Sequence, residues 1–355
     1  MTATPGPSAG VAAAVIPDET AQIAALHEGL LGWYAVNRRD LPWRQTRDPY
    51  RILLSEMMLQ QTQVPRVLPR WHAWLAQFPT LAALAAAPTA DVLRAWSGLG
   101  YNSRAVRLQT IARLVVAEHA GEMPRDVDAL LALPGIGDYT ARAVACFAYE
   151  QDVPVLDTNV RRVLHRVLVG PDAPKPTVSD RQMWALAARA VPAGRGYDWN
   201  QALMDFGSSL CTARKPACLV CPLRPICRAA PFIGGALAAQ QGARRQAART
   251  NATIAATPFT ATNRHYRGQA LRVLGAQPNN AGLDLTTLGP LVKPDYTAAD
   301  RPWLHTLMAA LHRDGLVTMR PAPPATPTAL RESPTPYQTE ETHETNTTRV
   351  SLPEG

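Results

Sequence analysis

Apolar side chains recur at helical spacing through most of the first 230 residues. Leu108, Ile111, Ala112 and Val115 fall at positions i, i+3, i+4 and i+7, which places them on one face of a helix. The same spacing predicts helices within 21–35, 67–87, 91–97 and 181–191. Alternating runs of Val, Ile and Thr, which are typical of strands, are scarce before residue 230. This part of the chain is therefore expected to be all-α.

The regular pattern is confined to residues 21–231. Residues 1–20 and 321–355 show no sustained periodicity and are rich in small residues, Pro and Thr. Segments of this composition bury too little apolar surface to fold alone. We therefore expect disordered tails at 1–20 and 321–355.

A second pattern follows the helical unit. Residues 232–259 are rich in Ala, Gly and Gln with several Arg, and we expect a basic linker there. Within residues 260–320, helical stretches at 265–275 and 301–315 precede a strand-like stretch at 316–319. This order predicts a small winged-helix-like C-terminal module.

Charge and cysteine content narrow the class of protein. The formal net charge is +8, and the excess lies within 21–320 because both predicted tails are acidic. Such an excess suits a polyanion such as nucleic acid, although it also serves solubility alone. No apolar run of membrane-spanning length and no secretory signal pattern is present, so we expect a cytoplasmic protein that binds no membrane. In a reducing compartment, five cysteines favour metal binding over disulfides.

Four of the cysteines form a metal-ligand pattern. Cys211, Cys218, Cys221 and Cys227 have the spacing C-x6-C-x2-C-x5-C. Four thiolates suit either zinc or an iron–sulfur cluster. Structural zinc sites usually show two close Cys pairs, so the single C-x2-C disfavours zinc without excluding it. Cys146 lies in an apolar helical run and is expected in the core.

A glycine turn separates two predicted helices, 127–132 and 138–149. Its sequence, Leu-Pro-Gly-Ile-Gly, places Gly135 and Gly137 around one apolar residue. The exposed backbone N–H groups of such a turn bind phosphate without selecting a base sequence. Many similar turns merely connect helices, so the turn alone is weak evidence for DNA binding.

Two carboxylates are candidates for chemistry. Glu56 shares a helix face with Gln60 and Gln63, which fits either an ordinary solvated stripe or a general acid at the edge of an apolar pocket. Asp157 directly precedes a helical run, where Asp is favoured as an N-cap. The residues alone favour the ordinary role at least equally for Glu56, and clearly for Asp157.

Longer motifs resemble one enzyme family. LPGIGDYTARAV, the cysteine cluster about eighty residues later, SEMMLQQTQV and LDTNVRRV together resemble the MutY-type adenine glycosylases of the endonuclease III superfamily. The resemblance covers residues 21–231. It implies a helix-hairpin-helix glycosylase fold, with a six-helix barrel at 41–149 and an iron–sulfur domain built from 21–40 plus 150–231. It also implies one 4Fe-4S cluster, rather than zinc, on the four cysteines.

The resemblance assigns catalytic roles to four residues. Glu56 would protonate the adenine, Asp157 would stabilise positive charge on the sugar, and Asn159 would orient Asp157 and the attacking water. The chemistry needs two carboxyl groups in different protonation states, as in glycoside hydrolysis. Endonuclease III-like relatives lack the equivalent of Glu56, so this residue points to adenine. Tyr139 stands where bifunctional members carry a nucleophilic Lys, which favours base removal without strand cleavage.

The resemblance also implies residues that bind the substrate. Residues expected around the adenine are Trp43, Arg44 and Gln201. Leu99 and Tyr101 are expected to press around the lesion base, and Gln61 and Thr62 to insert into the opened duplex or to bond near it. Core packing is the ordinary alternative for Trp43, Leu99 and Tyr101. The target base has to leave the helical stack before its bond can be attacked, and inserted side chains fill the gap.

The sequence therefore predicts a monofunctional adenine glycosylase in base-excision repair. Its expected partner is double-stranded DNA with A:8-oxoguanine or A:G mispairs, bound by a monomer. The Nudix-like domain of long family members is not recognisable in 232–320. The first alternative is a mismatch thymine/uracil glycosylase, against which Glu56 argues. The second is a non-catalytic iron–sulfur DNA-binding protein, which leaves the carboxylate pair unexplained.

Overall fold

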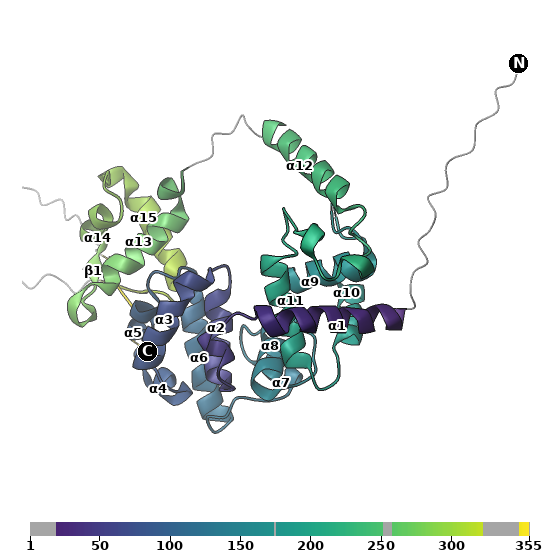
Figure 1. Ribbon diagram of the computed structural model, residues 1–355. Coiled ribbons are helices and arrows are strands. Elements are labelled where there is room, and N and C mark those ends of the chain that lie inside the picture. The colour runs from purple at the N-terminus through teal and green to yellow at the C-terminus, as the bar shows by residue number, and fades with distance from the viewer. Residues whose placement is uncertain (1–18, 174, 251–257, 322–347, 355) are drawn as a thin grey trace, which may run out of the picture. The chain divides into compact units, whose positions relative to one another are not determined.

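The chain forms two compact units (Figure 1). The computed structural model describes residues 19–173, 175–250, 258–321 and 348–354. The first unit comprises residues 1–45 and 141–253, and the second comprises 46–140 and 254–355. Most of both expected tails lies outside the described residues. No helix of the described residues is long and apolar enough to cross a membrane.

The first unit is helical. Its helices are α1 (Glu19–Asn37), α9 (Thr158–Leu164), the π-helical turn η2 (His165–Val169), α10 (Asp180–Ala190), α11 (Gly196–Ser209) and α12 (Ile233–Thr250). Short 3-10 turns are η1 (Pro42–Arg44), η3 (Cys218–Val220) and η4 (Arg224–Ile226). Residues 233–250, expected within a linker, are thus helical, which suits their high content of Ala, Gln and Arg.

The core of the first unit lies where α1, α9 and α11 pack together. Leu26, Val163, Trp199 and Phe206 are fully or almost fully buried there. The buried amide of Gln22 donates hydrogen bonds to the carbonyls of residues 167 and 226, at 3.0 and 2.8 Å. This one side chain therefore ties α1 to both the α9 segment and the end of the cysteine loop.

The second unit contains the remaining early helices. These are α2 (Pro49–Leu59), α3 (Val64–Gln77), α4 (Leu81–Ala86), α5 (Thr89–Trp96), α6 (Ser103–Glu118) and α7 (Val127–Ala132), while α8 (Asp138–Tyr149) crosses the unit boundary. The apolar pattern at 67–87 divides into two helices, because Thr80 caps α4 by accepting the N–H of Ala83. Trp74 and Trp96 meet edge to face in the core.

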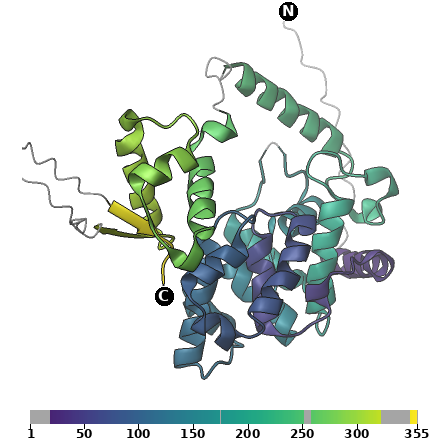
Figure 2. The same ribbon diagram turned by 90° about the vertical axis from the view of Figure 1, so that its left-hand side faces the viewer.

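A winged-helix-like module belongs to the second unit (Figure 2). It runs through α13 (Asn263–Gly275), β1 (Leu283–Asp284), α14 (Leu285–Val292), α15 (Arg301–Arg313), β2 (Thr318–Pro321) and β3 (Thr348–Ser351), with short 3-10 turns η5 (Phe259–Ala261), η6 (Pro278–Asn280) and η7 (Ala298–Asp300). The strands form an antiparallel sheet in the order β1-β3-β2. The two expected helices and the expected strand match α13, α15 and β2.

The strand β3 differs from the expected tail over 321–355. Val350 is fully buried and pairs with Leu283 on one side and Met319 on the other. A four-residue alternation is too short to stand out in the sequence. Pairing with partners on both sides stabilises it as a strand, so the tail expectation does not hold for these residues.

Candidate active site and cysteine loop

Glu56 is buried in the second unit. It lies on α2 with 7% of its surface exposed, and the hydroxyl of Tyr139 donates a hydrogen bond to its Oε2 at 2.7 Å. Gln63 is exposed whereas Glu56 is buried, so Glu56, Gln60 and Gln63 do not form one solvated stripe. The prediction of an ordinary solvated position for Glu56 is therefore wrong. Tyr139, at the start of α8, closes over the carboxyl from 83 residues away in the sequence.

The glycine turn joins the two predicted helices, which are α7 and α8. Asp126 begins α7 by accepting the N–H groups of residues 128 and 129. Gly135 has a φ of +80°, and the side chain of Arg107 lies where a Cβ at this position would stand. No atom lies within 4 Å of the corresponding point at Gly137. The turn therefore needs Gly135 for its shape and leaves the backbone at Gly137 open to a ligand.

Two loops of the second unit meet through their tips. Gln61 and Tyr101 both have positive φ angles, 55° and 47°, and their side chains are hydrogen-bonded to each other. Tyr101 is 40% exposed, whereas Leu99 is buried. Thr62 hydrogen-bonds to the carbonyl of Gln60. Of the residues expected at the lesion base and the opened duplex, Gln61 and Tyr101 thus face solvent and Leu99 packs inside.

Arg104 holds these two loops together. Only 4% of it is exposed, and its guanidinium donates to the carbonyls of Met57, Gln60 and Gly100 at 2.6, 2.8 and 3.0 Å. It also lies over the ring of Tyr101. Within the described residues it has no carboxylate partner. Burial lowers the pKa of Arg104 to about 10, which leaves it charged at neutral pH.

Asp157 caps α9 in the first unit. Its Oδ1 accepts the N–H groups of Asn159 and Val160 at 2.8 and 2.6 Å, and its Oδ2 accepts the side-chain amide of Asn159 at 2.9 Å. The ordinary N-cap role is therefore confirmed, and the same bonds fix the direction of the carboxylate. Glu56 belongs to the other unit, so the meeting of the two carboxylates at one site stays a prediction.

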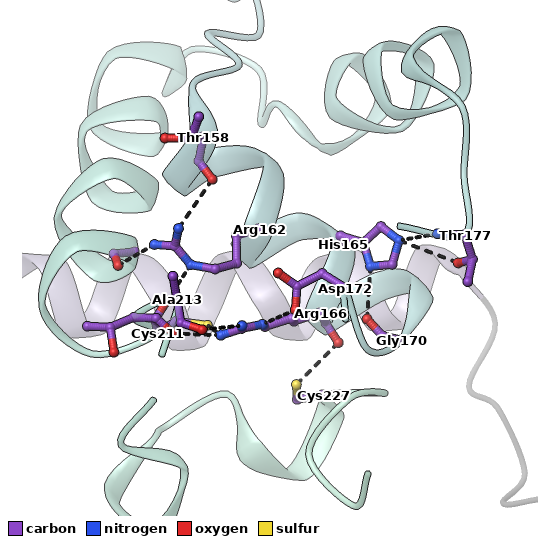
Figure 3. Close-up of polar contacts among 12 residues, drawn as sticks. Thr158, Arg162, His165, Arg166, Gly170, Asp172, Thr177, Cys211, Ala213 and Cys227 are labelled. Carbon is purple, nitrogen blue, oxygen red and sulfur yellow. Dashed lines mark hydrogen bonds and ion pairs between the residues drawn. The ribbon is translucent and has the colours of Figure 1, made fainter. Parts of the chain in front are cut away.

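Arg162 connects Asn159 to the cysteine loop. Its guanidinium donates to Asn159 Oδ1 at 2.7 Å and to the carbonyl of Gly207 at 2.6 Å. It also donates to the carbonyl of Cys211 at 2.8 Å (Figure 3). A Cβ on Gly207 would lie 2.7 Å from the Cβ of Asn159, so only glycine permits this approach. Burial lowers the pKa of Arg162. A continuous path of hydrogen bonds thus leads from Asp157 to the first cysteine.

Arg166, one turn later, holds the start of the cysteine loop (Figure 3). It forms a buried ion pair with Asp172 at 2.6 Å and donates to the carbonyls of Thr212 and Ala213. Its Nη1 lies 3.7 Å from the Sγ of Cys211. Burial alone would lower the pKa of Arg166, but the hydrogen bonds and charges of Asp172 and Cys211 together outweigh burial, and the pKa is raised. A fixed positive charge therefore faces this sulfur.

The four cysteine side chains line one cavity in the first unit. Burial raises the pKa of Cys211 and Cys227, and that of Cys221 to about 11. Among the residues that the structure describes, no three ligating side chains converge closely enough for a single metal ion. A cluster of several irons and sulfides is wider than one ion, and four thiols beside an arginine fit its donor set and negative charge. The donor set and the neighbouring arginine therefore fit an iron–sulfur cluster.

The residues expected around the adenine lie in the first unit. Trp43 is buried, and the guanidinium of Arg44 bonds both oxygens of Asp205 at 2.7 and 2.8 Å. Gln201 is buried one turn before Asp205 on α11. Burial by itself would raise the pKa of Asp205, but Arg44 and Arg39 hold it below its usual range. Arg44 thus positions α11, and its contact with adenine stays a prediction.

Sequence reasoning missed the arginines Arg104, Arg162 and Arg166. One signal was present, because each lies close to a buried apolar residue of its own helix. Leu108 follows Arg104 by one turn, and Val163 and Val167 directly follow the other two arginines. A charged residue so close to a buried face needs internal partners. The partners themselves are backbone carbonyls, which no sequence pattern reveals.

Two known protein families match the parts of the chain that contain these residues. Residues 54–189 match the HhH-GPD superfamily of base excision DNA repair proteins, and residues 211–227 match the iron-sulfur binding domain of endonuclease III. The first match contains Glu56, Tyr139, Asp157 and Asn159. The second begins and ends at the outer cysteines, so the chain carries an iron–sulfur cluster.

Individual relatives narrow the family. The chain is 48% identical to the adenine DNA glycosylase of Mycolicibacterium smegmatis over 69% of its own length and 78% of that protein. It is 44% identical to the human adenine DNA glycosylase, of which it spans 40%. A thermostable thymine-DNA glycosylase structure is 32% identical, with a TM-score of 0.57 over 60% of this chain and 99% of that one. The chain belongs to the adenine DNA glycosylase family of the HhH-GPD superfamily.

Proposed function

We propose that this protein removes adenine from double-stranded DNA in base-excision repair, at A:8-oxoguanine and A:G mispairs. The observation that carries the proposal is the buried Glu56 carboxyl, which accepts a hydrogen bond from Tyr139. Burial and the bond from Tyr139 hold this carboxyl in one orientation, so a proton on its second oxygen has a fixed direction. The family membership supports adenine as the base that receives this proton.

The reaction uses the two carboxyl groups in different ways. With Tyr139 bonded to Oε2, the proton of Glu56 resides on Oε1 and passes to a ring nitrogen of the extruded adenine. The N-glycosidic bond then breaks, and the sugar develops positive charge opposite the Asp157 carboxylate. Asn159, bonded to Asp157, is placed to orient the water that supplies the new C–O bond, and the proton that this water loses returns the Glu56 carboxylate to its acid form. Free adenine and an abasic site result.

Strand cleavage is not part of the proposed activity. A bifunctional glycosylase needs an amine nucleophile to form a Schiff base with the sugar. Tyr139 carries a phenol and donates to Glu56 instead. The expected product therefore retains an intact phosphate backbone until alkali is added.

Cys211, Cys218, Cys221 and Cys227 would hold one 4Fe-4S cluster. When bound, the cluster supplies a rigid cross-link of the cysteine loop, as structural metal sites do. Arg166 would compensate the negative charge of the cluster. Arg162 bonds both Cys211 and Asn159, so it would fix the cysteine loop relative to Asn159. Four irons and four inorganic sulfides per chain would support the proposal, whereas zinc in stoichiometric amount would contradict it.

The test is a single-turnover excision assay with an alkali step. Duplexes carry adenine opposite 8-oxoguanine, guanine, cytosine or thymine. We expect cleavage only after alkali, and only opposite 8-oxoguanine and guanine. Glu56→Gln should lose excision by several orders of magnitude while it still binds duplex and keeps its iron. The proposal would be wrong if the wild-type protein held its cluster and bound duplex but released no adenine.

A mismatch thymine/uracil glycosylase is the second candidate. The 32% identity to the thermostable thymine-DNA glycosylase favours it. The higher identity to adenine DNA glycosylases and the presence of Glu56 favour adenine. Duplexes with G:T and G:U mispairs in the same assay separate the two, because excision there without adenine release would reverse the assignment.

The proposed enzyme acts as a monomer on chromosomal DNA in the cytoplasm. Light scattering of the purified protein, alone and with one equivalent of duplex, tests the monomer. A mass corresponding to two chains in either sample would contradict it.

A further inference from the structure

A large cleft in the second unit lies between α13 and the two loops that carry Gln61 and Tyr101. Its volume is about 1240 Å³. Residues 61–63 and 97–103 form one wall, and α13 forms much of the other. The module is anchored beside it, because Arg94 on α5 donates to the carbonyl of Gly275 at 3.0 Å.

The lining of this cleft is basic. It contains no Asp or Glu, and its arginines are Arg66, Arg94, Arg264, Arg267 and Arg272. Arg94 and Arg267 are paired with Asp91 and Asp314. Arg66 and Arg264 are exposed and have no carboxylate partner among the described residues. Charge of one sign without internal compensation selects an anionic ligand.

Arg264 joins the module to the loop tips. Its guanidinium lies over the ring of Tyr101 at 4.3 Å from the centroid, and Tyr101 is in turn bonded to Gln61. Both loop residues are among those expected at the lesion base and the opened duplex. The cationic head of Arg264 therefore stands at the place where a phosphate next to that opening would need a counter-charge.

The spacing of the cations along α13 fits a polymer better than a single anion. Arg264 and Arg272 are eight residues apart, about 12 Å along the helix axis. One DNA strand rises about 3.4 Å per nucleotide, so this length corresponds to roughly three nucleotides. A lone phosphate would contact only one end of such a row.

We propose that this cleft binds the sugar-phosphate backbone of duplex DNA beside the loop tips, with Arg264 and Arg66 as phosphate ligands. The winged-helix-like module then takes part in DNA binding through α13, the helix that lines the cleft. The inference rests on the proposed function for the choice of duplex DNA among anionic polymers.

The experiment measures how duplex affinity depends on salt. Each phosphate contact contributes a slope of about −0.9 in log K against log salt concentration. The probe is a fluorescein-labelled duplex that carries A opposite 8-oxoguanine. Arg264→Ala should make the slope shallower by about 0.9. The double variant Arg66→Ala/Arg264→Ala should make it shallower by about 1.8. Arg264→Lys keeps the charge and should retain the wild-type slope.

Arg313→Ala is the matched control, because Arg313 is an exposed arginine of the same module outside the cleft. Its slope should equal that of the wild type. If Arg264→Ala also keeps the wild-type slope and affinity while the wild type excises adenine, the cleft proposal is wrong and the proposed function stands. If Arg264→Ala makes the slope shallower but the wild type releases no adenine, the cleft proposal is supported and the proposed function is wrong.

Discussion

Two buried arginines, one in each unit, organise the loops on which the candidate site depends, and their charges are balanced differently. Arg166 in the first unit forms an ion pair with Asp172, which raises its pKa. Arg104 in the second unit bonds backbone carbonyls, and burial lowers its pKa to about 10. Both hold a loop by its backbone, but only one has a counter-charge.

This difference shows two ways to fix a functional loop. Both arginines hold their loops through carbonyl dipoles, which attract a cation only at close range: Arg166 bonds residues 212 and 213, and Arg104 bonds residues 57, 60 and 100. Arg166 is also attracted to Asp172, which lies outside the cysteine loop, and charge–charge energy falls slowly with distance. Arg166 therefore keeps a counter-charge when a loop carbonyl moves away, whereas Arg104 depends on its loop carbonyls alone.

Replacement of Arg104 should have the largest effect. Arg104→Met leaves several buried carbonyls without a donor and should lower the free energy of unfolding by roughly 2–4 kcal/mol. Arg104→Lys, which keeps the charge but has fewer donors, should recover part of this loss. Urea denaturation measures both. Equal stability of the Met variant and the wild type would remove the basis of the comparison.

Removal of Asp172, the counter-charge of Arg166, makes the two arginines directly comparable. Asp172→Asn turns Arg166 into an arginine balanced by neutral acceptors, as Arg104 is. Because the Asp172 side chain is 20% exposed, we expect a moderate loss, roughly 1–3 kcal/mol, and a lower iron content per purified chain. Full iron occupancy with unchanged stability would mean that neutral acceptors suffice at both positions.

Replacement of Arg162 tests whether the cysteine loop positions the candidate catalytic Asp157 through Asn159. Arg162→Gln breaks the bonds to Asn159 and Cys211 and should slow single-turnover excision about 10- to 100-fold with duplex affinity unchanged. Arg161→Gln is the matched control, since its ion pair with Asp180 is on the surface. A similar loss in both variants would indicate general destabilisation instead of positioning.

The smallest expected effect is a change in the free energy of unfolding at acidic pH. Arg44 and Arg39 hold the pKa of Asp205 below its unfolded value, so this pair stabilises the fold above about pH 4 and the contribution is lost as pH falls through the folded pKa. Asp205→Asn should therefore cost stability at pH 7 and less below pH 4. Arg104 has no carboxylate, so the cost of Arg104→Met should stay constant over the same range. Urea midpoints at both pH values give the result.

The sequence predicted those features whose determinants are local. The helices on both sides of Gly135 begin and end as expected, because an Asp cap and a glycine turn define them within a few residues. The cysteine spacing indicated a metal centre for the same reason, and the family resemblance implied that it is an iron–sulfur cluster. Glu56 was undecided, since the residue that covers it, Tyr139, comes from a distant part of the chain.

Long-range contacts explain what remained hidden. The carbonyls that bind Arg104 come from two loops about forty residues apart, and backbone groups carry no residue identity. The same holds for Arg264, whose position over Tyr101 depends on how the module packs. Polar residues whose partners lie far along the chain were therefore assigned ordinary roles or overlooked.

The strand order β1-β3-β2 has a consequence for synthesis on the ribosome. The central strand, β3, is translated after both of its neighbours and after the intervening residues 322–347. Until Ser351 has left the exit tunnel, β1 and β2 each present an unpaired edge that other chains can join. The helical part of the second unit, α13 included, can fold earlier, so the small sheet of the module is completed last, after translation has passed β3.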